Sequence, residues 1–239
     1  MRGHGPRMLL LTLCVAGCSF DLTDLPGETR AAFHAQLFAN TQTDRLAINA
    51  SLAPGVGSDA NIRTVLTDLL VAGRPVPPLA AADGNRTYEA DWSLSAELAN
   101  GGSLELRAPE LEGIPSSATP AFRVTLPARA GPDTLHIDDG DTVILHVDLP
   151  ADRTGVAQWR LDVSDSTGAV HLVVQSNGYP PPQIPIPATW FSSDSPAHTV
   201  RLHVHQAFSG DVTPDQYAAA ATVDALLHWT VVFATDPEP

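Results

Sequence analysis

The sequence predicts an all-β protein that contains two β-sandwich domains in tandem. The first observation is a two-residue alternation of apolar and polar side chains, which recurs along most of the chain and is typical of half-buried strands. The second is the frequency of turn-forming residues, with 17 glycines and 21 prolines among 239 residues. The third is the scarcity of helix signals. Together they favour many short strands joined by turns.

The first expected domain covers residues 30–126. Its longest alternating segment runs from Arg86 to Leu98, and an Asn100-Gly101-Gly102 turn then predicts a hairpin with the following strand. Trp92 lies at an apolar position of that segment and is expected in the core. Shorter segments of the same kind occupy residues 33–39, 46–52 and 122–126. This number of strands in about 100 residues favours an immunoglobulin-like sandwich.

The second expected domain covers residues 133–236, after a linker at 127–132 with the sequence PARAGP. Its apolar alternation predicts strands that include residues 143–149, 157–163, 200–204 and 227–233, with Trp229 in the core. The one helix signal is Thr213-Pro214-Asp215-Gln216, in which a capping threonine precedes proline at the first helical position. We expect a short helix that continues through 217–221, or alternatively a loop before the last strand.

The first seventeen residues have the composition of a secretory signal peptide. Arg2 and Arg7 form a basic start, Met8 to Ala16 form an apolar segment, and small residues follow. The apolar segment is shorter than the ~20 residues that a membrane-spanning helix needs. It is therefore expected to be a cleaved leader, residues 1–17.

The four residues Val15-Ala16-Gly17-Cys18 resemble a bacterial lipobox, the motif at which signal peptidase II cuts before a lipid-modified cysteine. The resemblance implies that Cys18 carries fatty acyl groups such as palmitate, and that residues 18–29 form a tether. It also implies a location in the cell envelope. Ser19 is not the aspartate that resembles an inner-membrane retention signal, which favours the outer membrane over the inner one.

Charge excludes several classes of partner. All 13 basic residues are arginines, against 27 acidic residues, and the formal net charge is −14. Nucleic-acid binding and electrostatic binding to anionic lipid both require clustered positive charge. We therefore expect the membrane to be contacted through the N-terminal lipid, and any other ligand to be an envelope protein or a glycan. No cofactor is expected.

Catalytic motifs are not found in the sequence. It has no Gly-x-Ser-x-Gly elbow, phosphate-binding loop, His-Glu-x-x-His pair or dinucleotide-binding glycine pattern. The sequence contains no lysine, which excludes catalysis by a lysine side chain. A catalytic pair of aspartate or glutamate side chains is not excluded. We expect a protein that is not an enzyme, and an uncharacterised hydrolase is the third hypothesis.

The second hypothesis is a copper or zinc site. His203 and His205 are two residues apart, so on a strand both imidazoles project from one face, and His146 or His228 would supply a third ligand. Alternatively these histidines face solvent, and Arg201 on the same face would repel a cation. The segment 138–141 (DDGD) is a hairpin turn or, less favoured, a calcium loop.

The most unusual segment of the mature chain is Tyr179–Phe191, with the sequence YPPPQIPIPATWF. Its five prolines exclude a central strand and predict an edge strand or an extended polyproline-like loop. Tyr179, Trp190 and Phe191 could bind a sugar or a peptide by stacking, or Trp190 and Phe191 could pack into the core. The leading hypothesis is a lipid-anchored envelope protein with a non-enzymatic binding or adhesion role.

Overall fold

The computed structural model describes residues 31–54, 64–80, 85–137, 142–151, 155–191, 194–209 and 217–233. The predicted leader, Cys18 and the tether lie outside these residues, as do the segments 138–141 and 213–216. The described chain is mostly strand, which confirms the all-β class. No helix among the described residues is long and apolar enough to cross a membrane.

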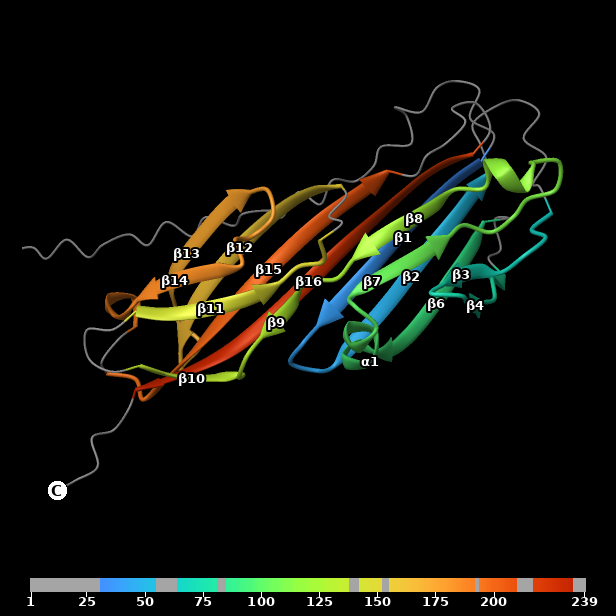
Figure 1. The fold of residues 1–239 in the computed structure, drawn as a ribbon. Helices are drawn as coiled ribbons and strands as arrows, with labels where there is room; N and C mark the ends of the chain where they lie inside the picture. The colour runs from blue at the N-terminus through green and yellow to red at the C-terminus, as the bar shows by residue number, and fades with distance from the viewer. Residues whose placement is uncertain are drawn as a thin grey trace, which may run out of the picture.

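A nine-stranded sheet runs through the whole molecule in the order β13-β12-β15-β16-β1-β2-β6-β5, and β10 pairs with the end of β16 (Figure 1). Its strands are β1 (Ala31–Asn40), β2 (Arg45–Pro54), β5 (Leu79–Ala80), β6 (Arg86–Ser93), β10 (Thr134–Ile137), β12 (Val156–Asp165), β13 (Val170–Asn177), β15 (Ala197–Ser209) and β16 (Ala218–Phe233).

Two smaller sheets lie in front of this long sheet in Figure 1, one toward each end. A four-stranded sheet has the order β4 (Arg74–Val76), β3 (Leu69–Val71), β7 (Ser103–Arg107), β8 (Ala121–Thr125). A three-stranded sheet has the order β14 (Gln183–Pro187), β11 (Thr142–Asp148), β9 (Ala128–Ala130). The apolar side chains of all three sheets form one buried cluster, so the two layers share one core.

The structure does not confirm two separate immunoglobulin-like sandwiches. β1, from the first expected domain, pairs in parallel with β16, from the second, in a register that runs from Ala32 beside Ala218 to Asn40 beside Leu226. The expected linker is also structured, because Ala128–Ala130 forms β9 and pairs with β11. Alternation predicts that a segment is a strand and which face it buries, but it does not predict the neighbouring strand.

The predicted strand over Arg86–Leu98 is wrong in its second half. β6 ends at Ser93, and Leu94–Ala99 form helix α1. Ser93 caps the helix by accepting a hydrogen bond from the amide of Ala96 at 3.3 Å, and Asp44 accepts hydrogen bonds from Ser93 Oγ and the amide of Ser95. These polar contacts at its N-terminus satisfy amide groups that would otherwise lack partners. Residues 100–102 therefore end a helix rather than form a hairpin turn.

Two further expectations concern the last strand and the two tryptophans. The helix expected to continue through 217–221 is wrong, because β16 begins at Ala218, which agrees with the alternative of a long last strand. The two tryptophans expected in the core differ in burial. Trp229 is fully buried, whereas Trp92 is half-buried against the core, with the guanidinium of Arg74 4.1 Å from its ring centre.

Candidate functional site

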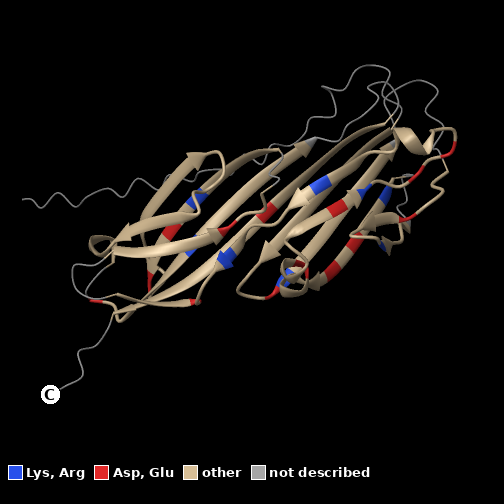
Figure 2. Ribbon diagram, viewed as in Figure 1, with Lys and Arg blue, Asp and Glu red and all other residues tan. Residues whose placement is uncertain are grey.

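The outer face of the nine-stranded sheet, which we define as the face turned away from the two small sheets, carries most of the sheet's charged side chains. On β1 and β2 the apolar residues expected to point inward are buried, so the residues between them face outward. In-register neighbours in antiparallel strands share a face, which places Arg160, His203 and Leu226 in one row and Gln158, His205 and Asp224 in the next. Acidic and basic residues are interspersed along the molecule (Figure 2).

His203 and His205 project from the same face of β15, as the sequence predicts, but each contacts a different carboxylate. His205 Nδ1 lies 2.7 Å from Asp224 Oδ1, and this hydrogen bond raises the pKa of His205. His203 Nε2 lies 3.4 Å from Asp162 Oδ2. Burial lowers the pKa of His203 despite this carboxylate. The nearest carboxylate therefore differs between the two imidazoles.

The remaining candidate ligands do not complete a metal centre with this pair. His146 is exposed on β11, at an outward position of the three-stranded sheet, so the core separates it from His203. His228 shares the outer face, in register with Arg201, and its pKa is lowered by burial and by Arg201 and Arg129. Among the described residues no group of three or more histidine, cysteine or acidic side chains is placed to hold a metal ion.

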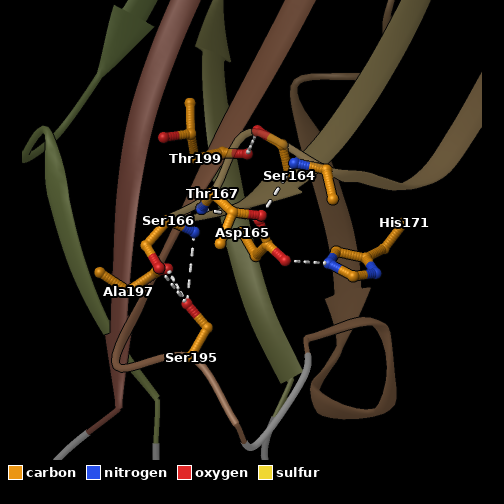
Figure 3. Close-up of polar contacts among 9 residues, drawn as sticks. Ser164, Asp165, Ser166, Thr167, His171, Ser195, Ala197 and Thr199 are labelled. Atoms are coloured by element: carbon orange, nitrogen blue, oxygen red, sulfur yellow. Dashed lines mark hydrogen bonds and ion pairs between the residues drawn. The ribbon is translucent and has the colours of Figure 1, made fainter.

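A second polar cluster lies at the turn between β12 and β13 (Figure 3). Asp165 Oδ1 accepts hydrogen bonds from the amide of Thr167 at 2.8 Å, its hydroxyl at 2.6 Å and the amide of Ala169 at 3.0 Å. Its other oxygen, Oδ2, lies 2.9 Å from His171 Nε2. These bonds, chiefly that from the Thr167 side chain, lower the pKa of Asp165. The carboxylate thus closes the turn.

Serine, histidine and aspartate all occur in this cluster, but not in a catalytic arrangement. Ser195 Oγ donates to the carbonyl of Ala197 at 2.8 Å and lies 3.1 Å from Ser166 Oγ. His171 lies on the other side of Asp165 from Ser195 (Figure 3). A nucleophilic serine needs a base within hydrogen-bond reach, and this serine has a carbonyl instead. The geometry here supports a structural turn.

The proline-rich segment is partly an edge strand, as predicted, because β14 is the outermost strand of the three-stranded sheet. Of its aromatic residues, Phe191 is 6% exposed and packs edge-to-face on His198 at 5.3 Å between ring centres. Phe191 is therefore a core residue and not a ligand contact. Trp190 packs half-buried against the same core, and Tyr179 is half-buried. Of the two interpretations of these aromatic residues, ligand stacking or core packing, the structure supports core packing for Phe191.

The most exposed aromatic side chain of the outer face was not among the predicted site residues. Phe38 is 42% exposed on β1, between Asp224 of β16 and Ala47 of β2. The signal was present in the sequence, since alternation that buries Leu37 and Ala39 turns Phe38 outward. Phe38 therefore exposes a flat apolar ring on a face that also carries polar and charged side chains.

Comparison with known proteins adds no family: no protein-family model matches the chain, and no curated protein matches its sequence.

Proposed function

We propose that the protein is a lipid-anchored component of a bacterial cell envelope, held by an acylated Cys18, whose folded part has a non-enzymatic binding or adhesion role. The observation that carries the binding role is the exposed ring of Phe38 in the interior of a broad sheet face. Envelope location rests on the lipobox resemblance, with the outer membrane favoured over the inner one. The membrane is contacted through the lipid.

The surroundings of Phe38 favour a glycan of the envelope as the ligand, ahead of an envelope protein. Gln36 and Asn49 lie in register with each other one row away on the same face, and both are exposed. Asp224 and Asp91 share the row of Phe38 through the register of β16, β2 and β6. An aromatic ring offers a flat apolar contact, and the amide and carboxylate groups around it offer hydrogen bonds to hydroxyls.

Glycan-array binding and co-sedimentation with cell-wall polysaccharide test this role, with Phe38→Ser compared with Ile144→Ser. Ile144 is 43% exposed on the three-stranded sheet, so the control removes a similar apolar surface elsewhere. We expect Phe38→Ser to weaken binding at least about tenfold, which corresponds to about 1.4 kcal/mol, and Ile144→Ser to leave it unchanged. Equal binding by wild type and Phe38→Ser would contradict the role of this face.

The lipid anchor is tested separately with Cys18→Ala. Each acyl chain on Cys18 would add about 0.8 kcal/mol of membrane-binding free energy per buried methylene group, so several chains would hold the protein firmly on the membrane. We expect the variant to lose incorporation of a labelled fatty acid and to leave the membrane fraction, or to accumulate as uncleaved precursor. Normal-size variant protein that remains in membranes would refute the anchor. Fractionation of outer and inner membranes tests the location.

The alternative function is copper or zinc binding through His203 and His205. It is favoured by their common face and by the Nε2 atom of His205, which is buried without a hydrogen-bond partner in the structure. Against it, Asp162 and Asp224 already engage the two rings and the described residues supply no third ligand. The metal content of the purified protein distinguishes metal binding from the binding or adhesion role. Bound copper or zinc that is lost in His203→Gln and His205→Gln would support the metal site. An enzymatic hydrolase is the third function, and a panel of hydrolase substrates tests it.

A further inference from the structure

Strand β13 forms one margin of the nine-stranded sheet (Figure 1). It pairs with β12 on one side, and no other described strand pairs with it on the other. The amide of Gly178 donates to the carbonyl of Ala157 at 2.7 Å, so this residue directs its backbone groups toward β12. In an antiparallel strand, successive residues direct their backbone N–H and C=O groups to opposite sides of the strand. The backbone groups that point away from β12 are therefore those of Val173, Gln175 and Asn177. The margin therefore offers a row of hydrogen-bonding groups.

The other sheet margins in the described chain carry features that oppose pairing with another chain. β5 and β10 have only two and four residues. The remaining edge strands contain arginine or proline: Arg74 and Pro75 in β4, Arg123 in β8, Arg129 in β9, and Pro185 and Pro187 in β14. Short edges, charged side chains and prolines are the devices by which monomeric proteins avoid edge-to-edge association.

β13 has none of these devices. Its eight residues, VHLVVQSN, include no arginine, aspartate, glutamate or proline. Leu172 and Val174 pack against the core, whereas Val170 and Val173 are 54% and 50% exposed. The pairing of β13 with β12 has one irregularity, at Val163/Ser164 near the turn that joins the two strands. Residues 172–177 pair with β12 in one continuous register. A long, uncharged and partly apolar edge is a template for another strand.

We propose that β13 is a self-association edge, which pairs antiparallel with β13 of a second copy of this chain and extends the sheet across a two-fold axis. Antiparallel pairing about such an axis places the same strand on both sides. With the axis at Gln175, the outward groups of Gln175 meet their equivalents and those of Val173 meet those of Asn177 in the second copy. A second copy carries the same net charge of −14. An edge without charged residues is the margin at which two such acidic molecules meet without like charges directly opposite.

Sedimentation velocity of the purified full-length protein, over about a hundredfold range of concentration, tests the proposal. Val173→Lys places a charged side chain on the pairing edge of each copy, which is a device that opposes edge-to-edge association. Ile144→Lys is the matched control on the central strand of the three-stranded sheet. Wild type and Ile144→Lys are expected to dimerise as concentration rises, and Val173→Lys to raise the dimer dissociation constant at least about tenfold. Circular dichroism verifies that each variant folds.

A second measurement does not depend on a lysine variant. Because Val173 and Gln175 direct their amides away from β12, these amides exchange rapidly in a monomer and become protected in the dimer. Hydrogen exchange of the wild type is expected to slow at 173 and 175 as concentration rises, with no change at the β11 amides. Wild type that stays monomeric at every concentration overturns the proposal. So does equal weakening by Val173→Lys and Ile144→Lys, or exchange at 173 and 175 that is independent of concentration.

Discussion

Leu37 of the first described strand lies in register beside Val223 of the last, in a parallel pair that joins the two halves of the chain. Both side chains are fully buried. β16 also pairs along most of its length with β15, so it contacts strands from both halves at once. Because this pairing joins segments that are distant in the sequence, each half of the chain lacks part of the sheet without the other, and we expect the shared sheet to be a cooperative unit.

The first prediction is that the two halves do not fold alone. A chain of residues 30–126 lacks β16 and leaves the edge of β1 unpaired, and a chain of 133–236 loses β1 in turn. We expect each half to be insoluble or to unfold without a cooperative transition, and residues 30–236 to unfold in one transition. Circular dichroism and calorimetry of all three chains decide this. Two soluble halves with separate melts would instead support two independent domains.

The second prediction concerns the ion pair of Arg74 and Glu97, in which the carboxylate side chain is only 4% exposed. Arg74→Ala leaves this carboxylate buried without its partner and removes the stacking on Trp92, and we expect a loss of about 2–4 kcal/mol of stability. Glu97→Gln removes the charge and keeps the shape, so its loss should be smaller. Denaturant unfolding of both variants and the double variant measures the coupling. A larger loss for Glu97→Gln than for Arg74→Ala would contradict this account.

The third prediction is a pH dependence of stability with opposite contributions from two histidines. Burial lowers the pKa of His203 below its ordinary value of 6.5, so the unfolded chain binds a proton more readily and stability falls as pH decreases through this value. The hydrogen bond to Asp224 raises the pKa of His205 above 6.5, so its contribution is fully present below that pH and is lost as pH rises through the folded pKa.

We therefore expect His203→Gln to reduce the loss of melting temperature between about pH 8 and pH 5, and His205→Gln to increase it. His34, His198 and His228 also have pKa values lowered by burial, so the wild type itself should be less stable in acid. Melting curves of the three proteins across this range are the measurement. Parallel curves for both variants and wild type would show that neither ring is coupled to folding.

The fourth prediction compares two glycines with nearly the same φ angle, Gly155 at +90° and Gly178 at +91°. A Cβ on Gly155 would lie 2.4 Å from the carbonyl oxygen of Ala207, whereas one on Gly178 would meet nothing within 4 Å. Gly178→Ala should cost about 1–2 kcal/mol for the left-handed conformation alone. Gly155→Ala should cost at least about 1 kcal/mol more, because β15 must move. Equal unfolding free energies would contradict the close approach.

Several features of this protein follow from the sequence by itself. Period-two alternation predicts the strands and the buried faces of β1, β2 and β11, because side chains in a strand alternate between faces. The prolines of 179–191 predict the edge position of β14, because each removes a ladder donor. The common face of His203 and His205 follows from the same alternation. These are local rules, and they depend on residues within a few positions of one another.

Other features were decided only by the tertiary structure. The parallel pairing of β1 with β16, the carboxylates that engage each histidine and the separation of His146 from that face all depend on which strands become neighbours. The helix at Leu94–Ala99 interrupts an alternating pattern because Asp44, some fifty residues earlier, supplies hydrogen bonds at its start. Alternation is the same for every strand pairing that buries the same face, so the choice between pairings depends on the packing of the complete core.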